Sequence, residues 1–285
     1  MESQLENSLK NLLNSKLSDL ERHLDADVLV YYGPIGNLNE NLFLKIVEEL
    51  AHSAERHDTL YIMLTTTGGS AIAVERYVNI IRYHYSEVYF IVPDYAYSAG
   101  TIFCMSGDGI YMDYFSVLGP IDPQVQNKEG KWVAALGYLD KVNEYIEKAK
   151  AGTLTNVEFA ILKDFDIAEL RGFEQARDLT IDLLKKWLVK YKFKNWTKHS
   201  NGSEVTIEEK RNRAKEIAGH LSDNNDWKSH GRPINIETLK ELGLQIEDYS
   251  ENMELRTKVR DYYETMSDFI RLKGFSNFIH DRIFL

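Results

Sequence analysis

The chain contains one cysteine, Cys104, which excludes an internal disulfide framework and any metal site built from several cysteines. No run of residues approaches the roughly 18 apolar positions of a transmembrane helix. The first ten residues, MESQLENSLK, are polar and partly acidic, whereas a secretory signal needs an apolar segment there. The formal net charge of −10 argues against a nucleic-acid surface. We therefore expect a cytoplasmic protein with no transmembrane segment and no nucleic-acid partner.

Motifs for common cofactors are also missing. The sequence has no glycine-rich phosphate loop and no dinucleotide fingerprint. Its histidines lack the spacing of metal ligands, because His52 and His57 are five residues apart and His84 stands alone. We expect neither a cofactor nor a metal. The length of 285 residues and a hydrophobic content of 44% permit one large domain with a sizeable core and a helical addition.

The first half of the chain alternates short apolar runs with helical patterns. Leucines at helical spacing indicate an amphipathic docking helix over residues 3–24, on this domain or on a neighbouring subunit. Further on, β-rich runs alternate with helix-like segments, which predicts mostly parallel strands joined by helical crossovers. The expected strands are 27–32, 59–64, 87–92 and 110–117. After about residue 137 the sequence is charged and typical of helices, over 138–150, 163–193, 206–221 and 251–272.

Two of the expected strand ends carry features that suit acyl transfer. Gly68-Gly69 follows the second strand, and these glycines let the backbone turn sharply and present N–H groups to a ligand. Ser70 can cap the helix that follows. Ser98 lies between small residues just after the third strand, with the N–H of Ala99 beside it. Taken singly, these are an ordinary tight turn and an ordinary helix-capping serine. Together they can form an oxyanion hole beside a nucleophile.

A third feature, Leu118-Gly119-Pro120-Ile121-Asp122-Pro123-Gln124, follows the fourth strand, where Asp122 is by itself an ordinary turn residue. With Thr66-Thr67-Gly68-Gly69 and Tyr97-Ser98-Ala99-Gly100, it makes residues 26–125 resemble the Clp/crotonase superfamily of peptidases. Within it, the chain looks most like the serine dehydrogenase proteinase family, which is signal-peptide-peptidase-like (S49-type). Ser229-His230-Gly231-Arg232-Pro233-Ile234 resembles the segment that supplies the third triad residue in Clp-type subunits.

The resemblance implies an α/β fold of the Clp/crotonase type, with a mostly parallel β-sheet, helical crossovers and a helix-rich C-terminal half. We divide the chain into an N-terminal helix (1–25), a catalytic core (26–150) and a helical extension (151–285) in which 226–249 completes the active-site region. By the same resemblance, Ser98 is the nucleophile and the N–H groups of Gly69 and Ala99 form the oxyanion hole. Gly68 and Tyr97 contact substrate. The family also implies a homo-oligomer.

The base that activates the serine is left open: it is one of two candidates or another group, or the site has none. The chain has no histidine between Ser98 and His199, so the order of the Clp proteolytic subunit is absent. In one solution His230 is the base and Asp122 orients it, which is acceptable because triads are defined by geometry. In the other, Lys141 is the base of a Ser-Lys dyad, and burial must then lower its pKa. A loop histidine and a solvated helix lysine are the ordinary interpretations of these residues.

Three functions follow from this pattern. The leading one is a serine endopeptidase that cleaves unfolded or membrane-derived polypeptides, bound as an added strand. Because no ATP site is visible, folded substrates would need a separate, unidentified protein partner. The second is a crotonase-like acyl-CoA enzyme that holds an enolate with the same N–H groups. The third is a non-catalytic oligomeric scaffold with a degenerate site.

Overall fold

A computed structural model describes residues 4–126 and 130–283 of the chain. Its centre is a six-stranded sheet in the order β10-β1-β2-β3-β5-β9. Five of the strands run parallel, and β10 pairs antiparallel with β1. The strands are β1 (Asp27–Tyr32), β2 (Thr59–Thr65), β3 (Glu87–Val92), β5 (Gly109–Met112), β9 (Glu247–Asp248) and β10 (Phe278–His280). The expected α/β fold with a mostly parallel sheet is confirmed.

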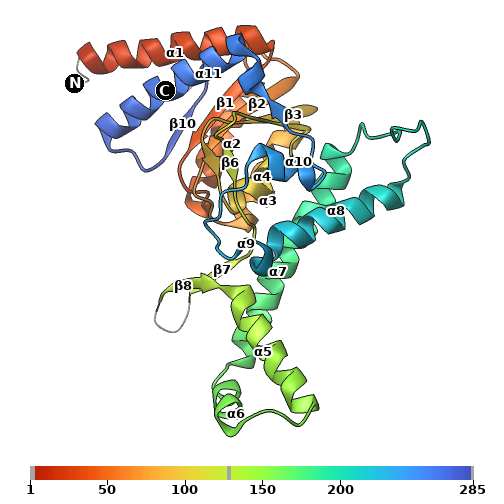
Figure 1. Ribbon diagram of the computed structural model, residues 1–285. Helices are drawn as coiled ribbons and strands as arrows, with labels where there is room; N and C mark the ends of the chain where they lie inside the picture. The colour runs from red at the N-terminus through yellow and green to blue at the C-terminus, as the bar shows by residue number, and fades with distance from the viewer. Residues whose placement is uncertain (1–3, 127–129, 284–285) are drawn as a thin grey trace.

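Helices cover both faces of the sheet, which explains why its central strands are apolar nearly throughout. Alternate side chains of each strand point to opposite faces. Thus Leu29 and Ile62 belong to one apolar cluster, whereas Val28 and Met63 belong to another. The second cluster is covered by α1 (Gln4–Leu24) and α11 (Met253–Lys273), which lie side by side in Figure 1.

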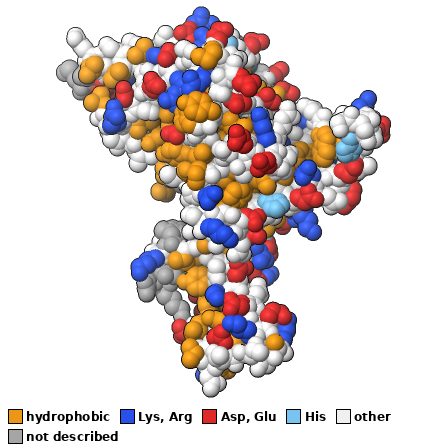
Figure 2. All heavy atoms as spheres, in the orientation of Figure 1, with side chains coloured by type: hydrophobic (Ala, Val, Ile, Leu, Met, Phe, Trp, Pro, Cys, Tyr) orange, Lys and Arg blue, Asp and Glu red, His pale blue; other side chains and the backbone are white. Residues whose placement is uncertain are grey.

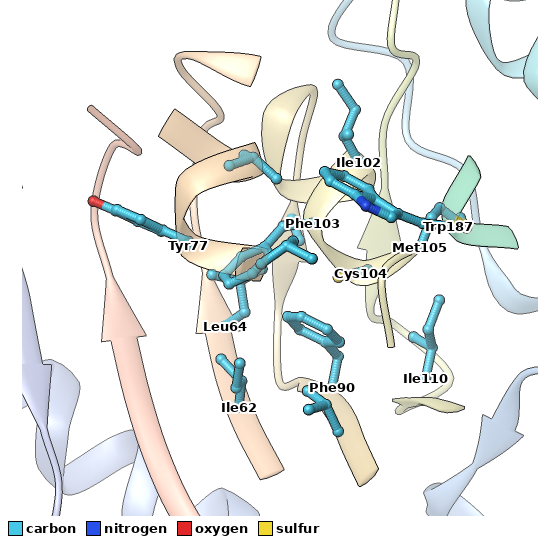
Figure 3. Packing of buried hydrophobic residues seen from close by; sticks show 14 of the residues in the cluster. Ile62, Leu64, Tyr77, Phe90, Ile102, Phe103, Cys104, Met105, Ile110 and Trp187 are labelled. Atoms are coloured by element: carbon cyan, nitrogen blue, oxygen red, sulfur yellow. The ribbon is translucent and has the colours of Figure 1, made fainter. Parts of the chain in front are cut away.

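The other face of the sheet packs against helices drawn from both halves of the chain. Figure 3 shows Phe103 and Cys104 above Phe90 and Ile62, with Trp187 entering from a distant segment. Cys104 is buried, and burial raises the pKa of its thiol to about 12. The helices on this side are α2 (Glu40–Ala51), α3 (Ala71–His84), α4 (Ala99–Cys104), the end of α7 (Ile167–Trp187), α8 (Ile207–Ser222) and α10 (Ile236–Glu241).

A helical arm projects from this core, and Figures 1 and 2 show it as the narrow lower part of the molecule. It consists of α5 (Ala135–Lys150), α6 (Asn156–Lys163) and the first half of α7. A hairpin of β7 (Gln124–Gln126) and β8 (Trp132–Ala134) connects the core to it. The remaining elements are β4 (Tyr95–Ala96), β6 (Val117–Leu118), α9 (Asn224–Trp227), the π-helical turn Leu188–Lys192, and 3₁₀ turns at Asn37–Asn39 and Tyr249–Glu251.

The expected helix over 3–24 is confirmed as α1, but only part of its leucine stripe is buried. Leu13, Leu17 and Leu20 are fully buried against the chain's own sheet, whereas Leu5 and Leu12 stay exposed. The expected strand over 110–117 is divided into β5 and β6, because residues 113–116 form a turn between them. No helix in the part of the chain that the structure describes is long and apolar enough to cross a membrane.

Candidate active site

Four segments are linked by backbone pairing at the carboxyl end of the sheet. Every predicted site residue except Lys141 lies on or directly beside one of them. Thr66, just beyond β2, pairs with Ala96 of β4, and Ala96 pairs with Leu118 of β6. Leu118 in turn pairs antiparallel with Ile234. Backbone hydrogen bonds of 2.9 and 3.0 Å link Leu118 and Ile234 in both directions. Segments 229–234 and 118–124 are therefore held together although they lie far apart in the sequence.

This bridge brings two loops of the candidate site together. Asp122 lies four positions after Leu118, in the loop that leaves the bridge, and His230 lies four positions before Ile234, in the turn that enters it. Nδ1 of His230 lies 2.8 Å from Oδ1 of Asp122. The carboxylate of Asp122 is buried, and the imidazole is 26% exposed. The structure thus brings together the two residues that the sequence proposed as base and orienting carboxylate.

The hydrogen bonds around Asp122 hold the imidazole in one tautomer. Gln124 donates from Nε2 to Oδ2 of Asp122 over 3.0 Å, so both carboxylate oxygens have partners. A carboxylate facing Nδ1 favours the proton on that nitrogen, which leaves the lone pair on Nε2 of His230. The N–H of Ile121 donates to the carbonyl of Leu221 in α8 and anchors this loop to the helical layer.

Ser98 has a strained backbone conformation. Its φ is 53° and its ψ is −116°, and it is one of three non-glycine residues with positive φ among those described. The N–H of Gly100 donates to the carbonyl of Tyr97 over 2.8 Å, so Ser98 is the second residue of a type II′ turn, a position usually taken by glycine. Such strain costs about 1–3 kcal/mol and gathers at functional sites. A nucleophile on a sharp strand-to-helix turn has this geometry.

The hydroxyl of Ser98 is not used to cap α4. Ser98 is the N-cap residue of that helix, yet its side chain makes no capping hydrogen bond. The ordinary interpretation of Ser98 as a capping serine is therefore wrong, whereas Ser70 does cap α3 through the N–H of Ala73, as expected. Among the described residues, the hydroxyl of Ser98 bonds neither to His230 nor to Asp122. The hydrogen bond between Asp122 and His230 therefore forms without any contact to the hydroxyl of Ser98.

Gly68, a predicted substrate contact, lies close to Ser98, and Gly69 of the predicted oxyanion hole follows it. A Cβ atom on Gly68 would lie 2.7 Å from Cβ and 3.3 Å from Oγ of Ser98. Gly69 has a φ of +143°, and a Cβ atom there would lie 2.0 Å from the carbonyl oxygen of Ile35. Both positions therefore require glycine.

Among the described residues, neither N–H group predicted for the oxyanion hole has a hydrogen-bond acceptor. The N–H of Ser70 donates to Ile35, and that of Gly68 donates to Oγ1 of Thr66. No described residue accepts from the N–H of Gly69. Ala99 is the first residue of α4, where an N–H has no acceptor within the helix. Two backbone donors are thus available to a ligand.

Buried contacts that the sequence did not reveal support this arrangement. Oγ1 of Thr101 lies 2.9 Å from the carbonyl oxygen of Ala96 and 2.8 Å from that of Gly119, and it accepts from the N–H of Gly119. Gly119 packs against the ring of Tyr97, where a Cβ atom would lie 2.4 Å from Cδ1. Tyr97 also stacks on Tyr95 with ring centroids 5.5 Å apart. Nothing in the local sequence distinguishes Thr101 from other helix threonines.

Lys141 lies on α5 in the arm, away from this ladder. Its side chain is 60% exposed and pairs with Glu144 at 2.7 Å. The hydrogen bond and charge of Glu144 raise the pKa of Lys141 above its ordinary value. A lysine base needs the opposite shift, which burial would supply. In this chain the environment of Lys141 therefore does not favour the Ser-Lys alternative.

Comparisons with known proteins show the family of the chain. The family of ClpP-like SDH-type serine proteinases matches residues 47–208, which is more than half of the chain. The protein therefore belongs to the ClpP-like SDH-type serine proteinase family. The matched region includes Gly69, Ser98 and Asp122, but it ends before His230.

Two curated relatives are the uncharacterized proteins MJ1495 and MJ0137 of Methanocaldococcus jannaschii. Each is 30% identical to this chain, over 185 and 195 residues respectively. These matches cover 65% and 68% of the chain, but 51% and 56% of the relatives. The chain thus spans about half the length of the curated relatives it matches.

Solved structures with similarity include a mutant of the 1510-N membrane-bound stomatin-specific protease. It is 14% identical, with 80% of this chain and 82% of that chain covered and a TM-score of 0.46. A second mutant of that protease, in complex with a substrate peptide, is 16% identical over 79% and 75% of the chains, with a TM-score of 0.47. A ClpP1 mutant from Listeria monocytogenes is 14% identical over 79% and 92%, with a TM-score of 0.40.

Proposed function

We propose that this protein is a serine endopeptidase in which Ser98 is the nucleophile and His230, oriented by Asp122, is the general base. The observation that carries the proposal is the 2.8 Å contact between Nδ1 of His230 and the buried carboxylate of Asp122, on the same ladder of segments as Ser98. Membership of a serine proteinase family supports the reaction class.

The proposed reaction begins when a peptide binds in extended form beside Gly68 and Tyr97. Nε2 of His230 takes the proton of the Ser98 hydroxyl as Oγ attacks the peptide carbonyl. The negative charge on the carbonyl oxygen is stabilised by the N–H groups of Gly69 and Ala99. His230 then gives its proton to the leaving amine, and water hydrolyses the acyl-enzyme by the same path. The contact between Ser98 and His230 forms in the substrate complex, since catalytic hydrogen bonds are often long or absent in free enzymes.

We further propose that the protein acts as a homo-oligomer. Apolar side chains at the end of the arm are exposed in the single chain, and Ile167 is 83% exposed. Val157, Phe159 and Ile161 are also exposed there. Burying them against a second copy would remove this apolar surface from water. The three-part division of the chain, its cytoplasmic location, and a separate protein partner for folded substrates stay predictions from the sequence.

The test is labelling with a fluorescent fluorophosphonate, which reacts with activated serines. We expect the wild type to label and Ser98→Ala to lose all labelling. His230→Ala should lower the labelling rate by about 10²- to 10⁴-fold, because a general base contributes that much. Lys141→Ala should label like the wild type, as a matched control on an exposed residue. Gel filtration of the labelled protein reports its oligomeric state.

Two results would contradict the proposal. A correctly folded wild type that does not label would leave the non-catalytic scaffold as the better hypothesis. An acyl-CoA binding titration would then test the crotonase-like alternative. Loss of labelling in Lys141→Ala with His230→Ala unaffected would instead move the base to the arm.

A further inference from the structure

A pocket of about 470 Å³ opens at the carboxyl end of the sheet, the same end at which Ser98 lies. Tyr32, the last residue of β1, lines it together with Asp94 and Tyr95, which follow β3. Helix α11 and the turn after it complete the wall, through residues that include Tyr263, Arg271 and Phe275. None of the residues of the proposed peptidase mechanism lines the pocket. It is therefore a neighbour of the candidate active site and not part of it.

The pocket is within reach of a peptide bound at Ser98. Tyr95 precedes Ser98 by three residues, so their Cα atoms are at most about 11 Å apart. The ring of Tyr95 stacks on that of Tyr97, the predicted substrate contact, with centroids 5.5 Å apart. An extended peptide advances about 3.3 Å per residue. A substrate side chain about one to three residues from the bond that Ser98 attacks can therefore enter the pocket.

Asp94 supplies the carboxylate of this pocket. The hydroxyl of Tyr263 donates to its Oδ2 over 3.1 Å. Within residues 4–126 and 130–283, no side chain pairs with its Oδ1, and the residue is only half-buried. A half-buried carboxylate with one oxygen available can accept a charge-assisted hydrogen bond from a ligand.

Tyrosine rings surround this carboxylate. Tyr32, Tyr95 and Tyr263 line the pocket. Burial raises the pKa of Tyr95, Tyr97 and Tyr263, and a nearby negative charge adds to each shift. That charge is the carboxylate of Asp94, which therefore lies near all three rings. Because the face of a tyrosine ring attracts a cation within about 6 Å, the rings and the carboxylate favour the same kind of ligand.

Two arginines near the pocket are paired with other carboxylates. Arg271, at the rim, is 81% exposed and pairs with Asp268 at 2.6 Å. Arg260 lies 5.7 Å from the ring centroid of Tyr263 and pairs with Glu264 at 3.2 Å. These pairs neutralise the two arginines within their own helix. The carboxylate in the pocket is thus left to a cation from outside the described part of the chain.

We propose that this pocket is a subsite for a basic side chain, lysine or arginine, of the peptide that Ser98 cleaves. The ammonium or guanidinium group would donate to Oδ1 of Asp94, and its alkyl stem would lie against the rings of Tyr32 and Tyr95. Aromatic rings that meet a carboxylate are typical of sites that recognise organic cations. The inference rests on the proposed peptidase function and gives it a specificity, which is cleavage within about three residues of a basic one.

The test is calorimetric titration of the Ser98→Ala variant, which cannot cleave its ligand, with blocked heptapeptides. The peptides carry lysine, arginine or norleucine at the centre of six alanines, and norleucine has the apolar stem of lysine without its charge. We expect the lysine and arginine peptides to bind about tenfold more tightly than the norleucine peptide, because a hydrogen bond between charged groups contributes at least that much. The better of the two basic peptides shows whether an ammonium or a guanidinium is preferred.

Further substitutions in the Ser98→Ala background locate the site. Asp94→Asn keeps an oxygen acceptor for the hydroxyl of Tyr263 but removes the charge, so the three peptides should bind equally. Asp94→Lys should reverse the preference, so that a peptide with a central glutamate binds more tightly than the lysine peptide. Asp58→Asn is the matched control, at a carboxylate that is 90% exposed before β2, and should keep the preference for basic peptides.

Three results would overturn the proposal: equal binding of the lysine and norleucine peptides to Ser98→Ala, a preference that persists in a folded Asp94→Asn, or no binding of any peptide. Fluorophosphonate labelling of the wild type tests the nucleophile separately. A wild type that labels, with peptides that bind equally, would remove the subsite alone. A wild type that does not label, with binding of the lysine peptide that depends on Asp94, would remove the peptidase reaction alone.

Discussion

The sheet core and the helical arm differ in how much apolar surface they bury. The core buries two large apolar clusters on the two faces of one sheet. Among the described residues, the arm's own buried cluster consists of Ala135, Leu139 and Phe173. Its surface carries close ion pairs, such as those of Lys148 with Glu144 and with Glu158. Exposed pairs of this kind contribute about 0–1 kcal/mol each, so they cannot replace an apolar core.

The larger apolar clusters make the core the more stable region, and helix α7 links it to the arm. Helix α7 begins in the arm, and its end is anchored in the core by Leu183, Leu184 and Trp187. The residues of the proposed mechanism all lie on core segments. We therefore expect the arm to unfold locally at a lower free energy than the core. The predictions below test this comparison, beginning with the largest effect.

Truncating one buried aromatic residue in each region of α7 should separate the two. Trp187 is 2% exposed within the large core cluster, so Trp187→Ala should lower the free energy of global unfolding by about 3–5 kcal/mol. Phe173 lies on the same helix in the small arm cluster. Phe173→Ala should reduce hydrogen-exchange protection of arm amides and leave the urea midpoint of the core nearly unchanged. Equal shifts of the global midpoint would show that core and arm unfold as one unit.

The division between core and arm also marks what could be predicted from the sequence. The apolar runs at 27–32, 59–64 and 87–92 gave strands at those positions, because buried parallel strands are continuously apolar. In the arm, the expected helix over 163–193 is instead α7, which starts at Ile167 and is preceded by the unexpected helix α6. The side chains of Thr155 and Asp166 cap these two helices and set where each one starts.

The candidate site shows a similar limit. Ser98 and Asp122 were visible in the sequence because they follow expected strand ends and match a family motif, and His230 because its segment resembles one. The pairing of Leu118 with Ile234, which brings Asp122 to His230, joins segments more than a hundred residues apart and leaves no local pattern. The positive φ of Ser98 is equally invisible, since serine rarely adopts it.

A second prediction uses pH to weaken the core layer formed by α1, α11 and β10. His280 is fully buried and neutral: the hydroxyl of Tyr262 lies 2.5 Å from its Nδ1, and Oδ1 of Asn14 lies 2.8 Å from its Nε2. Burial lowers the pKa of His280 to about 3, whereas the unfolded value is near 6.5. Between these values the unfolded chain binds the extra proton, so stability falls as the pH falls below 6.5.

Urea unfolding at pH 7.5 and pH 5.0 measures this effect. We expect His280 to account for a loss of about 2 kcal/mol between the two values, because each pH unit below 6.5 costs about 1.4 kcal/mol. His280→Gln should remove this part of the pH dependence. His220→Gln, at a side chain that is 58% exposed, should not change it. A wild type and a His280→Gln variant with the same pH dependence would contradict the assignment.

The smallest effect is expected from a stabilising change in the arm. Gly172 lies inside α7, is exposed, and would have no atom within 4 Å of an added Cβ. Gly172→Ala should therefore stabilise the helix by about 1 kcal/mol, since glycine loses more conformational freedom there than alanine. If the arm opens separately, this gain appears as roughly fivefold stronger hydrogen-exchange protection of arm amides, with no change in the urea midpoint of the core. A raised global midpoint would instead mean that arm and core unfold together, and the arm would then contribute to the stability of the Ser98 site.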